Sequence, residues 1–397
     1  MGLTSREPPS ASRSGARGLA FLELLVAMAL SLIVAGAVAL VLGPMRGLFE
    51  TRIEANDMEQ RLRAAGDALS ADLLMAGAGA YAGARAGPLV DALPPVVPFP
   101  WAASGELATD AFSLVYVPAT AAQTVLASPL AARSGTALVA REPGCPLGDP
   151  ACGFSTGMHA LVYDGTGRFD LFTVRGTGAG TLDLRHELTD TGDVYPAGAK
   201  IVAVVARTYR LDQSDSEGPR LVREELGGSR EPVVDHVVGL HLDYEGAARP
   251  PELRAPGDAG GGWTTYGMKP PGAGVQEGSW PAGENCLFAL DPGTGQPVPR
   301  GAFLAGADDD ALVPLAPALF GDGPWCPEPG AAHRFDADLL RIRRVTVTLR
   351  VESAVAALRG AAGPLFARPG TATAGGARLP DREFRLVVAP RNLNLGR

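Results

Sequence analysis

Several residue types and motifs that mark catalytic, metal or nucleic-acid sites are scarce in this sequence. Its 397 residues include 4 cysteines and 5 histidines, and aromatic residues make up 6%. No G-x-x-x-x-G-K-S/T segment is present, so the chain carries no phosphate-binding loop of the kind that hydrolyses ATP to drive the assembly of other proteins. The formal net charge is −8, and a general nucleic-acid surface needs a basic stripe, so that class of binding is not expected.

Charged residues are almost missing from one long stretch near the start. From Leu19 to Leu42 nearly every residue is apolar, and the only charge is Glu23. About two dozen apolar residues are enough for a helix to cross a bilayer with ~30 Å of hydrocarbon. A carboxylate inside such a helix costs roughly 2.5–3.5 kcal/mol on insertion scales, so we expect Glu23 to have a partner. A plain signal anchor with Glu23 near the membrane edge is the alternative, whereas a cleaved secretory signal peptide has a shorter apolar run.

A helical pattern continues beyond the apolar stretch. Apolar residues recur at intervals of three and four and form a stripe of Met58, Leu62, Ala65, Leu69 and Leu73. The other faces are predicted to carry charged residues, namely Arg61, Arg63, Asp67 and Asp72. Pro44 predicts a kink because it removes a backbone hydrogen bond, and Gly77 predicts the end of the helix. A helix from Leu19 to Ala76 would be on the order of 85 Å long.

The start of the chain resembles the class III signal of type IV prepilins and pseudopilins. Gly18 matches the glycine before the cleaved bond, Leu19 the new N-terminus, and Glu23 the acidic residue at the fifth mature position. The Leu-Leu-Val-Ala-Met run after Glu23 is similar to the core of that signal. Two departures are mild, since Leu19 replaces the commoner Phe and Ala20 the commoner Thr.

Other segments resemble PilW-like minor pilins. The helix end at residues 72–77, Asp-Leu-Leu-Met-Ala-Gly, is similar to a motif at the corresponding place in those proteins. The likeness is close over residues 18–77 and looser over 200–245 and 340–393, where it concerns the order of strands. About half of the chain has no match beyond this class.

The resemblance implies processing and assembly roles for three residues. A prepilin peptidase would cut between Gly18 and Leu19 and methylate the new amine of Leu19. Glu23 would neutralise a subunit amine, in its own chain or a neighbour, and set the axial register of assembly. The implied partners are other pilin subunits, the prepilin peptidase, the inner-membrane pilus assembly platform and, before assembly, membrane lipid. Neither nucleic acid nor a cofactor is expected.

Charges beside the apolar stretch predict its orientation. Arg6, Arg13 and Arg17 precede it, whereas acidic residues mix with arginines after it. The positive-inside rule therefore places the N-terminus in the cytoplasm and the bulk of the chain outside. Together with the resemblance, this predicts a bacterial inner-membrane protein that crosses once and carries an external or periplasmic C-terminal head, with a filament formed after assembly.

The four cysteines fit an oxidising external compartment. Cys145 and Cys152 bound a short loop, Cys-Pro-Leu-Gly-Asp-Pro-Ala-Cys, and Cys286 and Cys326 remain. Four cysteines allow three pairings, and we expect Cys145–Cys152 with Cys286–Cys326. Zinc binding is the alternative, but neither pair has close C-x-x-C spacing and no histidine stands beside them at ligand spacing.

The predicted fold is α+β, with a long N-terminal transmembrane and amphipathic helix that packs on a pilin-like antiparallel β-sheet head. High glycine and proline content, 51 and 34 residues, favours strands joined by long loops. Strands are predicted at residues 112–117, 136–141, 159–164, 168–174, 181–185, 201–211, 220–225, 233–244, 340–352 and 384–388. The predicted segments are a leader 1–18, a membrane half-helix 19–42, an amphipathic half-helix 43–77, a β-rich head 78–245, a disulfide-stapled Gly/Pro-rich insertion 246–335 and C-terminal strands 336–397.

Two patterns indicate catalysis or metal binding only weakly. Ser155 lies in a Gly-x-Ser-x-Gly segment, but this nucleophile motif needs a strand before the serine and a helix after it, so a turn is expected here. The aspartates of residues 308–310, with Asp336 and Asp338, supply oxygen ligands for calcium without a known loop spacing, so a solvated acidic loop is favoured. No catalytic or metal residue is therefore assigned.

Two further sets of residues are weak candidates for binding sites. His236 and His241 would lie on opposite faces of one strand and make a poor metal pair. Arg341 and Arg343 would share a strand face near Arg344 and Arg350 and could meet DNA phosphates, but a solvated sheet face is the plainer interpretation.

The sequence as a whole predicts a non-enzymatic minor pilin or pseudopilin, a structural subunit that initiates or primes a type IV pilus or related filament. The alternatives are a pseudopilin of type II secretion or of DNA uptake and, less favoured, a membrane-tethered hydrolase built on Ser155.

Overall fold

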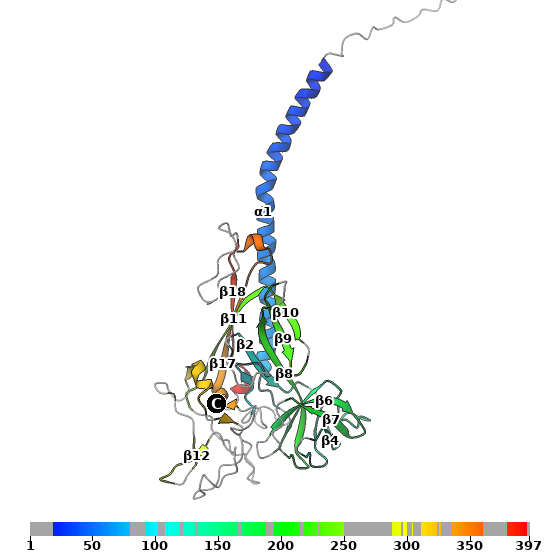
Figure 1. Ribbon diagram of the computed structural model, residues 1–397, viewed down its shortest axis with the longest axis vertical. Coiled ribbons are helices and arrows are strands. Elements are labelled where there is room, and N and C mark those ends of the chain that lie inside the picture. Colours follow the sequence, from blue (N-terminus) through cyan, green and yellow to red (C-terminus); the bar gives the residue numbers. More distant parts are fainter. Residues whose placement is uncertain are drawn as a thin grey trace, which may run out of the picture. The chain divides into compact units, whose positions relative to one another are not determined.

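The computed structural model of the chain describes most of the helix and the strands of the head (Figure 1). The residues described are 19–79, 93–101, 108, 110–119, 122–131, 134–164, 169–187, 194–214, 218–228, 230–249, 288–294, 297–299, 304, 311–323, 325–326, 335–359 and 379–394. The predicted leader, with Gly18, therefore lies outside the described residues, as does most of the predicted insertion.

The chain divides into two compact units, Met1–Asp57 and Met58–Arg397. Helix α1, Leu19–Met75, is 57 residues long and contributes to both of them. It continues through Gly43 and Pro44 without interruption, and the kink predicted there stays a prediction. The helix ends where predicted, because Gly77 adopts a left-handed φ of 76° that residues with a side chain rarely tolerate.

The larger unit contains a ten-stranded antiparallel sheet with the order β1-β2-β8-β5-β6-β7-β4, to which β3, β9 and β10 add. Its strands are β1 Val96–Val97, β2 Ala111–Tyr116, β3 Gln123–Val125, β4 Thr136–Leu138, β5 His159–Tyr163, β6 Phe169–Thr177, β7 Thr181–His186, β8 Lys200–Asp212, β9 Arg220–Glu225 and β10 Arg230–Asp235. Figure 1 shows β4, β6 and β7 grouped together.

Part of this sheet closes into a ring of strands. Strand β8 pairs with both β3 and β5. From β5 the pairing continues in order to β6, then to β7 and then to β4. A bridge between Leu126 and Val139 joins the ends of β3 and β4 and completes the circle. The inner side chains form one apolar core that includes Phe172, Ile201 and Leu182. Closure satisfies the backbone groups that an open edge would expose.

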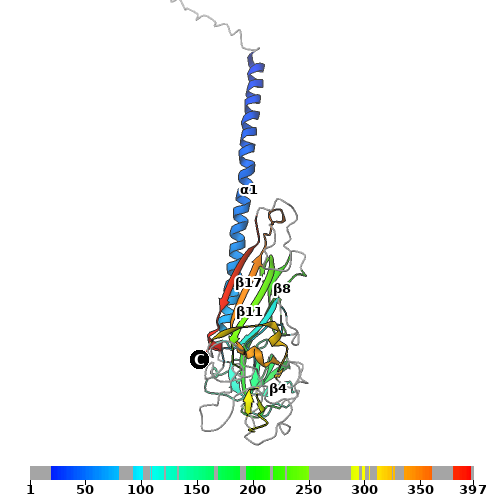
Figure 2. The same ribbon diagram turned by 90° about the vertical axis from the view of Figure 1, so that its left-hand side faces the viewer.

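A four-stranded antiparallel sheet has the order β14-β11-β17-β18. Its strands are β11 Val237–Ala247, β14 Leu312–Leu315, β17 Ile342–Val351 and β18 Arg382–Val388, and Figure 2 shows β11 and β17 side by side. On β17 the alternating residues Val345, Val347 and Leu349 lie in the core, and Thr346 and Arg350, which alternate with them, are buried as well. The fold is therefore α+β, with an N-terminal apolar helix and antiparallel sheets.

Short elements complete the described chain. Two strand pairs are β12 Phe288–Leu290 with β13 Pro297–Pro299, and β15 Trp325–Cys326 with β16 Phe335–Asp336. Single 3₁₀ turns are η2 Pro317–Phe320, η3 Ala337–Arg341, η4 Ala356–Leu358 and η5 Arg391–Leu393. Several of these elements lie inside the predicted insertion 246–335, which is thus not a plain loop.

Two of the predicted strands, 233–244 and 340–352, differ from the observed ones for a reason that the backbone shows. The segment 233–244 is split into β10 and β11 because His236 adopts a left-handed φ of 58°. Strand β11 also extends to Ala247, two residues into the predicted insertion. The strand predicted from residue 340 begins at Ile342, because Asp336 caps the turn η3 by accepting a hydrogen bond from Asp338 N.

Candidate functional sites

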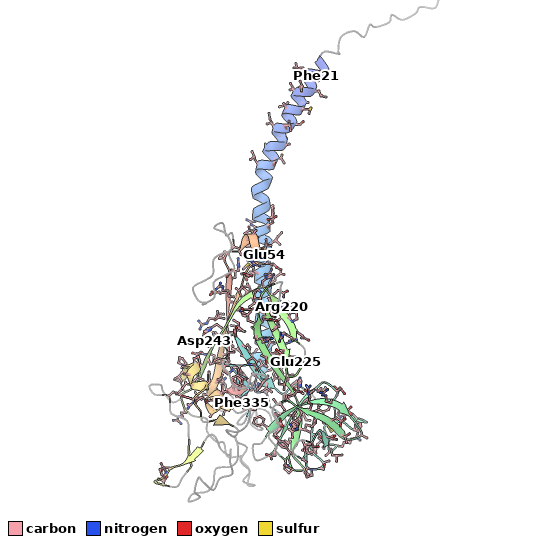
Figure 3. All side chains as sticks on the ribbon, in the orientation of Figure 1. Phe21, Glu54, Arg220, Glu225, Asp243 and Phe335 are labelled. Atoms are coloured by element: carbon pink, nitrogen blue, oxygen red, sulfur yellow. A yellow bond between two sulfur atoms is a disulfide. The ribbon has the colours of Figure 1, made fainter. Side chains whose placement is uncertain are left out.

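The first candidate site is the apolar segment of α1 in the smaller unit. Every residue from Phe21 to Leu40 is exposed, and Phe21 itself is 70% exposed (Figure 3). Leaving a large apolar side chain in water instead of burying it costs about 1.5–3 kcal/mol. The helix is long and apolar enough to cross a membrane, although a signal sequence passes the same test. This segment therefore requires a membrane or other protein surfaces to cover it.

The predicted processing and register residues lie at the start of this helix. Leu19 is the first residue of α1, and its side chain lies outside the described part of the structure. Glu23 is exposed on the first turns of the helix, among apolar side chains. A carboxylate at this position is costly in hydrocarbon unless a positive group or the membrane edge accommodates it. The roles predicted for Gly18, Leu19 and Glu23 stay predictions.

The second candidate site is a buried carboxylate near the end of α1, within the larger unit. Asp72 is 5% exposed and accepts three hydrogen bonds, from Tyr116 OH at 3.1 Å, Tyr209 OH at 2.6 Å and Arg207 Nη1 at 2.8 Å. Arg207 also forms an ion pair with Glu225 at 3.1 Å. Burial and the neighbouring Asp72 carboxylate raise the pKa of Tyr116 to about 12, and they raise the pKa of Tyr209 as well. Both hydroxyls therefore stay protonated and donate to Asp72.

The sequence prediction for Asp72 was wrong. It assigned Asp72 to the polar faces of the helix, whereas the side chain lies in the core with charged and phenolic partners. The spacing held a usable signal, because Asp72 follows Leu69 by three residues and immediately precedes Leu73 of the apolar stripe. The residues near Asp72 in sequence do not indicate its partners, because Tyr116, Arg207 and Tyr209 lie on strands far along the chain.

The predicted apolar stripe of α1 is buried, with exposures of 0% to 4%. Side chains of the same unit lie against other residues of this helix segment. Tyr209 OH donates to the carbonyl of Ala68 at 3.4 Å, and a Cβ on Gly66 would lie 2.7 Å from Cε1 of Phe384. Asn392 Nδ2 donates to the carbonyl of Met75 at 3.4 Å. This part of α1 thus contacts residues of β8, β18 and η5.

The predicted disulfide between Cys145 and Cys152 is present, with Cα atoms 4.5 Å apart. It closes the loop between β4 and β5. Cys326 lies in β15, and Cys286 lies outside the described residues, so their pairing stays a prediction. The apparent nucleophile Ser155 follows this loop in a turn, where its carbonyl accepts a hydrogen bond from Met158 N at 3.2 Å. The strand–turn–helix context of a nucleophile motif is not found around it.

The basic cluster does not form a shared strand face. Arg341 belongs to η3 and is 1% exposed; it pairs with Asp338 and donates to the carbonyl of Ala248 at 2.9 Å. Arg350 pairs with Asp381 at 2.7 Å, and Arg344 pairs with Glu245. The expectation that Arg341 and Arg343 lie side by side on one strand was therefore wrong, because the turn η3 ends only at Arg341.

Three aspartates, Asp322, Asp336 and Asp338, bring one carboxylate oxygen each within 4.8 Å of the others. The aspartates at 308–310, predicted to share a site with Asp336 and Asp338, lie outside the described residues. Asp336 accepts hydrogen bonds from Gly323 N at 2.6 Å and Asp338 N at 2.8 Å. Asp336 thus has backbone partners and Asp338 forms an ion pair with Arg341. We therefore interpret both buried carboxylates as structural groups.

The acidity of Asp336 gives a pH prediction. Burial raises its pKa from 3.8 to about 6, against the opposing effect of two backbone N–H donors. The folded chain then holds a proton that the unfolded chain releases between about pH 4 and pH 6. The free energy of unfolding contributed by this group should therefore decrease as pH rises through that window.

This effect can be measured by guanidinium unfolding of the full chain in detergent at several pH values between 4 and 7. The Asp336→Asn variant should lack the decrease, whereas Asp67→Asn, on an exposed part of α1, should keep it. Parallel pH profiles for the wild type and Asp336→Asn would contradict the prediction.

The two histidines do not share a strand. His236 lies at the break between β10 and β11, and its carbonyl accepts a hydrogen bond from Glu352 N at 3.0 Å. Burial, followed by the charges of Arg61 and Arg359, lowers the pKa of His236. His241 is exposed on β11, with Nε2 3.3 Å from Oδ1 of Asp243. Because the two histidines lie in different parts of the backbone and have different partners, we interpret each as a structural residue and not as half of a metal pair.

No protein-family model matches this chain, and no curated protein matches it.

Proposed function

We propose that this chain is a membrane-anchored minor pilin or pseudopilin, a non-enzymatic subunit that initiates or primes a type IV pilus or related filament. The observation that carries the proposal is the exposed apolar segment of α1 from Phe21 to Leu40, which holds a carboxylate at Glu23 and follows a Gly18–Leu19 junction that resembles a class III signal. Such a surface is stable in lipid and also against the helices of other subunits.

The head supports the same proposal. The second part of α1 buries its apolar stripe, and residues beside the stripe lie against Tyr209 of β8 and Phe384 of β18, an arrangement that a pilin-like head would have. The Asp72 cluster fixes the helix to β2 and β8 through hydrogen bonds and an ion pair. The bacterial inner membrane, with the head outside, is the proposed location before assembly.

The proposal also specifies processing and partners. A prepilin peptidase would cleave after Gly18 and methylate Leu19, and other pilin subunits and an inner-membrane assembly platform would then take up the mature chain. The DNA-uptake alternative gains no support, because Arg341, Arg344 and Arg350 are engaged within the chain. The hydrolase alternative gains none either, since Ser155 lies in a turn.

The proposed role of Glu23 can be tested with the Glu23→Ala variant. In a filament, the carboxylate would neutralise the amine of Leu19, so its loss should reduce incorporation into filaments by tenfold or more, which corresponds to about 1.4 kcal/mol. The measurement is the fraction of chain recovered in sheared filaments, with intact mass and N-terminal sequencing of the membrane-bound chain. Glu23→Gln distinguishes loss of charge from loss of shape.

Two results would contradict the proposal. One is normal incorporation of the Glu23→Ala variant, which would remove the register role. The other is a chain that still begins at Met1 in cells with an active prepilin peptidase, which would exclude processing and leave a signal-anchored exported protein.

A further inference from the structure

We draw no further inference here: the strongest candidate, the cluster of Asp322, Asp336 and Asp338 at the turns η2 and η3, carries nothing because its two buried carboxylates already have partners within the chain, and no second feature of the described residues points to a bound cation.

Discussion

Replacement of Gly246 by alanine is expected to lower the free energy of unfolding by roughly 3 kcal/mol, toward the upper end of overpacking effects. Gly246 lies near the end of β11, where the register with β17 shifts between Glu245 and Gly246. A Cβ at this position would collide with the carbonyl oxygen of Arg341 and lie 2.6 Å from its carbonyl carbon. The colliding atoms are backbone, so they cannot move aside as the end of a side chain can.

The surroundings of Gly246 make this clash difficult to relieve. The Arg341 side chain is buried and donates to the carbonyl of Ala248, two residues beyond Gly246. Cδ1 of Leu315 on β14 would also lie 2.7 Å from the added Cβ. Displacement of β11 from η3 would therefore disturb the bond to Ala248 and the contact with β14 together.

Guanidinium unfolding of the full chain in detergent, followed by tryptophan fluorescence, measures the effect of Gly246→Ala. Gly144→Ala is the matched control, because a Cβ at Gly144 meets nothing within 4 Å. That control should change the free energy of unfolding by less than about 0.5 kcal/mol. Equal stability of the two variants would show that β11 and η3 can separate at little cost.

Replacement of Asp72 by alanine is expected to cost about 3–5 kcal/mol, the range seen when one partner of a buried ion pair is removed. The substitution leaves Arg207 without its closest buried counter-charge and removes the acceptor of two phenolic hydroxyls. Tyr209 loses its 2.6 Å bond to the carboxylate, and its bond to the carbonyl of Ala68 is longer, at 3.4 Å. Unsatisfied buried polar groups account for most of the expected loss.

The same unfolding measurement distinguishes this site from the rest of α1. Asp67→Ala removes an exposed carboxylate from the same helix and should change stability by less than about 0.5 kcal/mol. A double-mutant cycle with Arg207→Met isolates the ion pair, and the expected coupling energy is at least about 1 kcal/mol. If Asp72→Ala is as mild as Asp67→Ala, the cluster does not hold the helix to the strands.

The spacing of apolar residues along the sequence was sufficient to predict much of the secondary structure. The stripe from Met58 to Leu73 is buried as its spacing predicts, and β9 begins and ends at the predicted residues. The strand predicted at 340–352 is present as β17, Ile342–Val351, with its valines in the core. In each case the pattern repeats over neighbouring residues, so the buried face follows from helix or strand geometry alone.

The failures occur where a side chain or a backbone angle depends on distant parts of the chain. Asp72 was assigned to solvent, but its partners Tyr116 and Tyr209 are 44 and 137 residues away in sequence. The break between β10 and β11 depends on a left-handed φ at His236, a residue that can also continue a strand. In the sequence, the closed loop with Leu147 at its tip showed two cysteines and two prolines, but no sign that Leu147 is exposed.

The sequence alone determines the long apolar run, its single carboxylate, the amphipathic continuation of the helix and the alternation of the longer strands. These features depend on the order of residue types over one or two turns, so no other part of the chain can change them. Only the tertiary structure decides which charges are buried, because Asp72, Arg341 and Arg350 gain partners when strands distant in sequence pair. It also closes the strand ring that supports the disulfide loop, since β3 pairs with β8 and β4 with β7, strands from later parts of the chain.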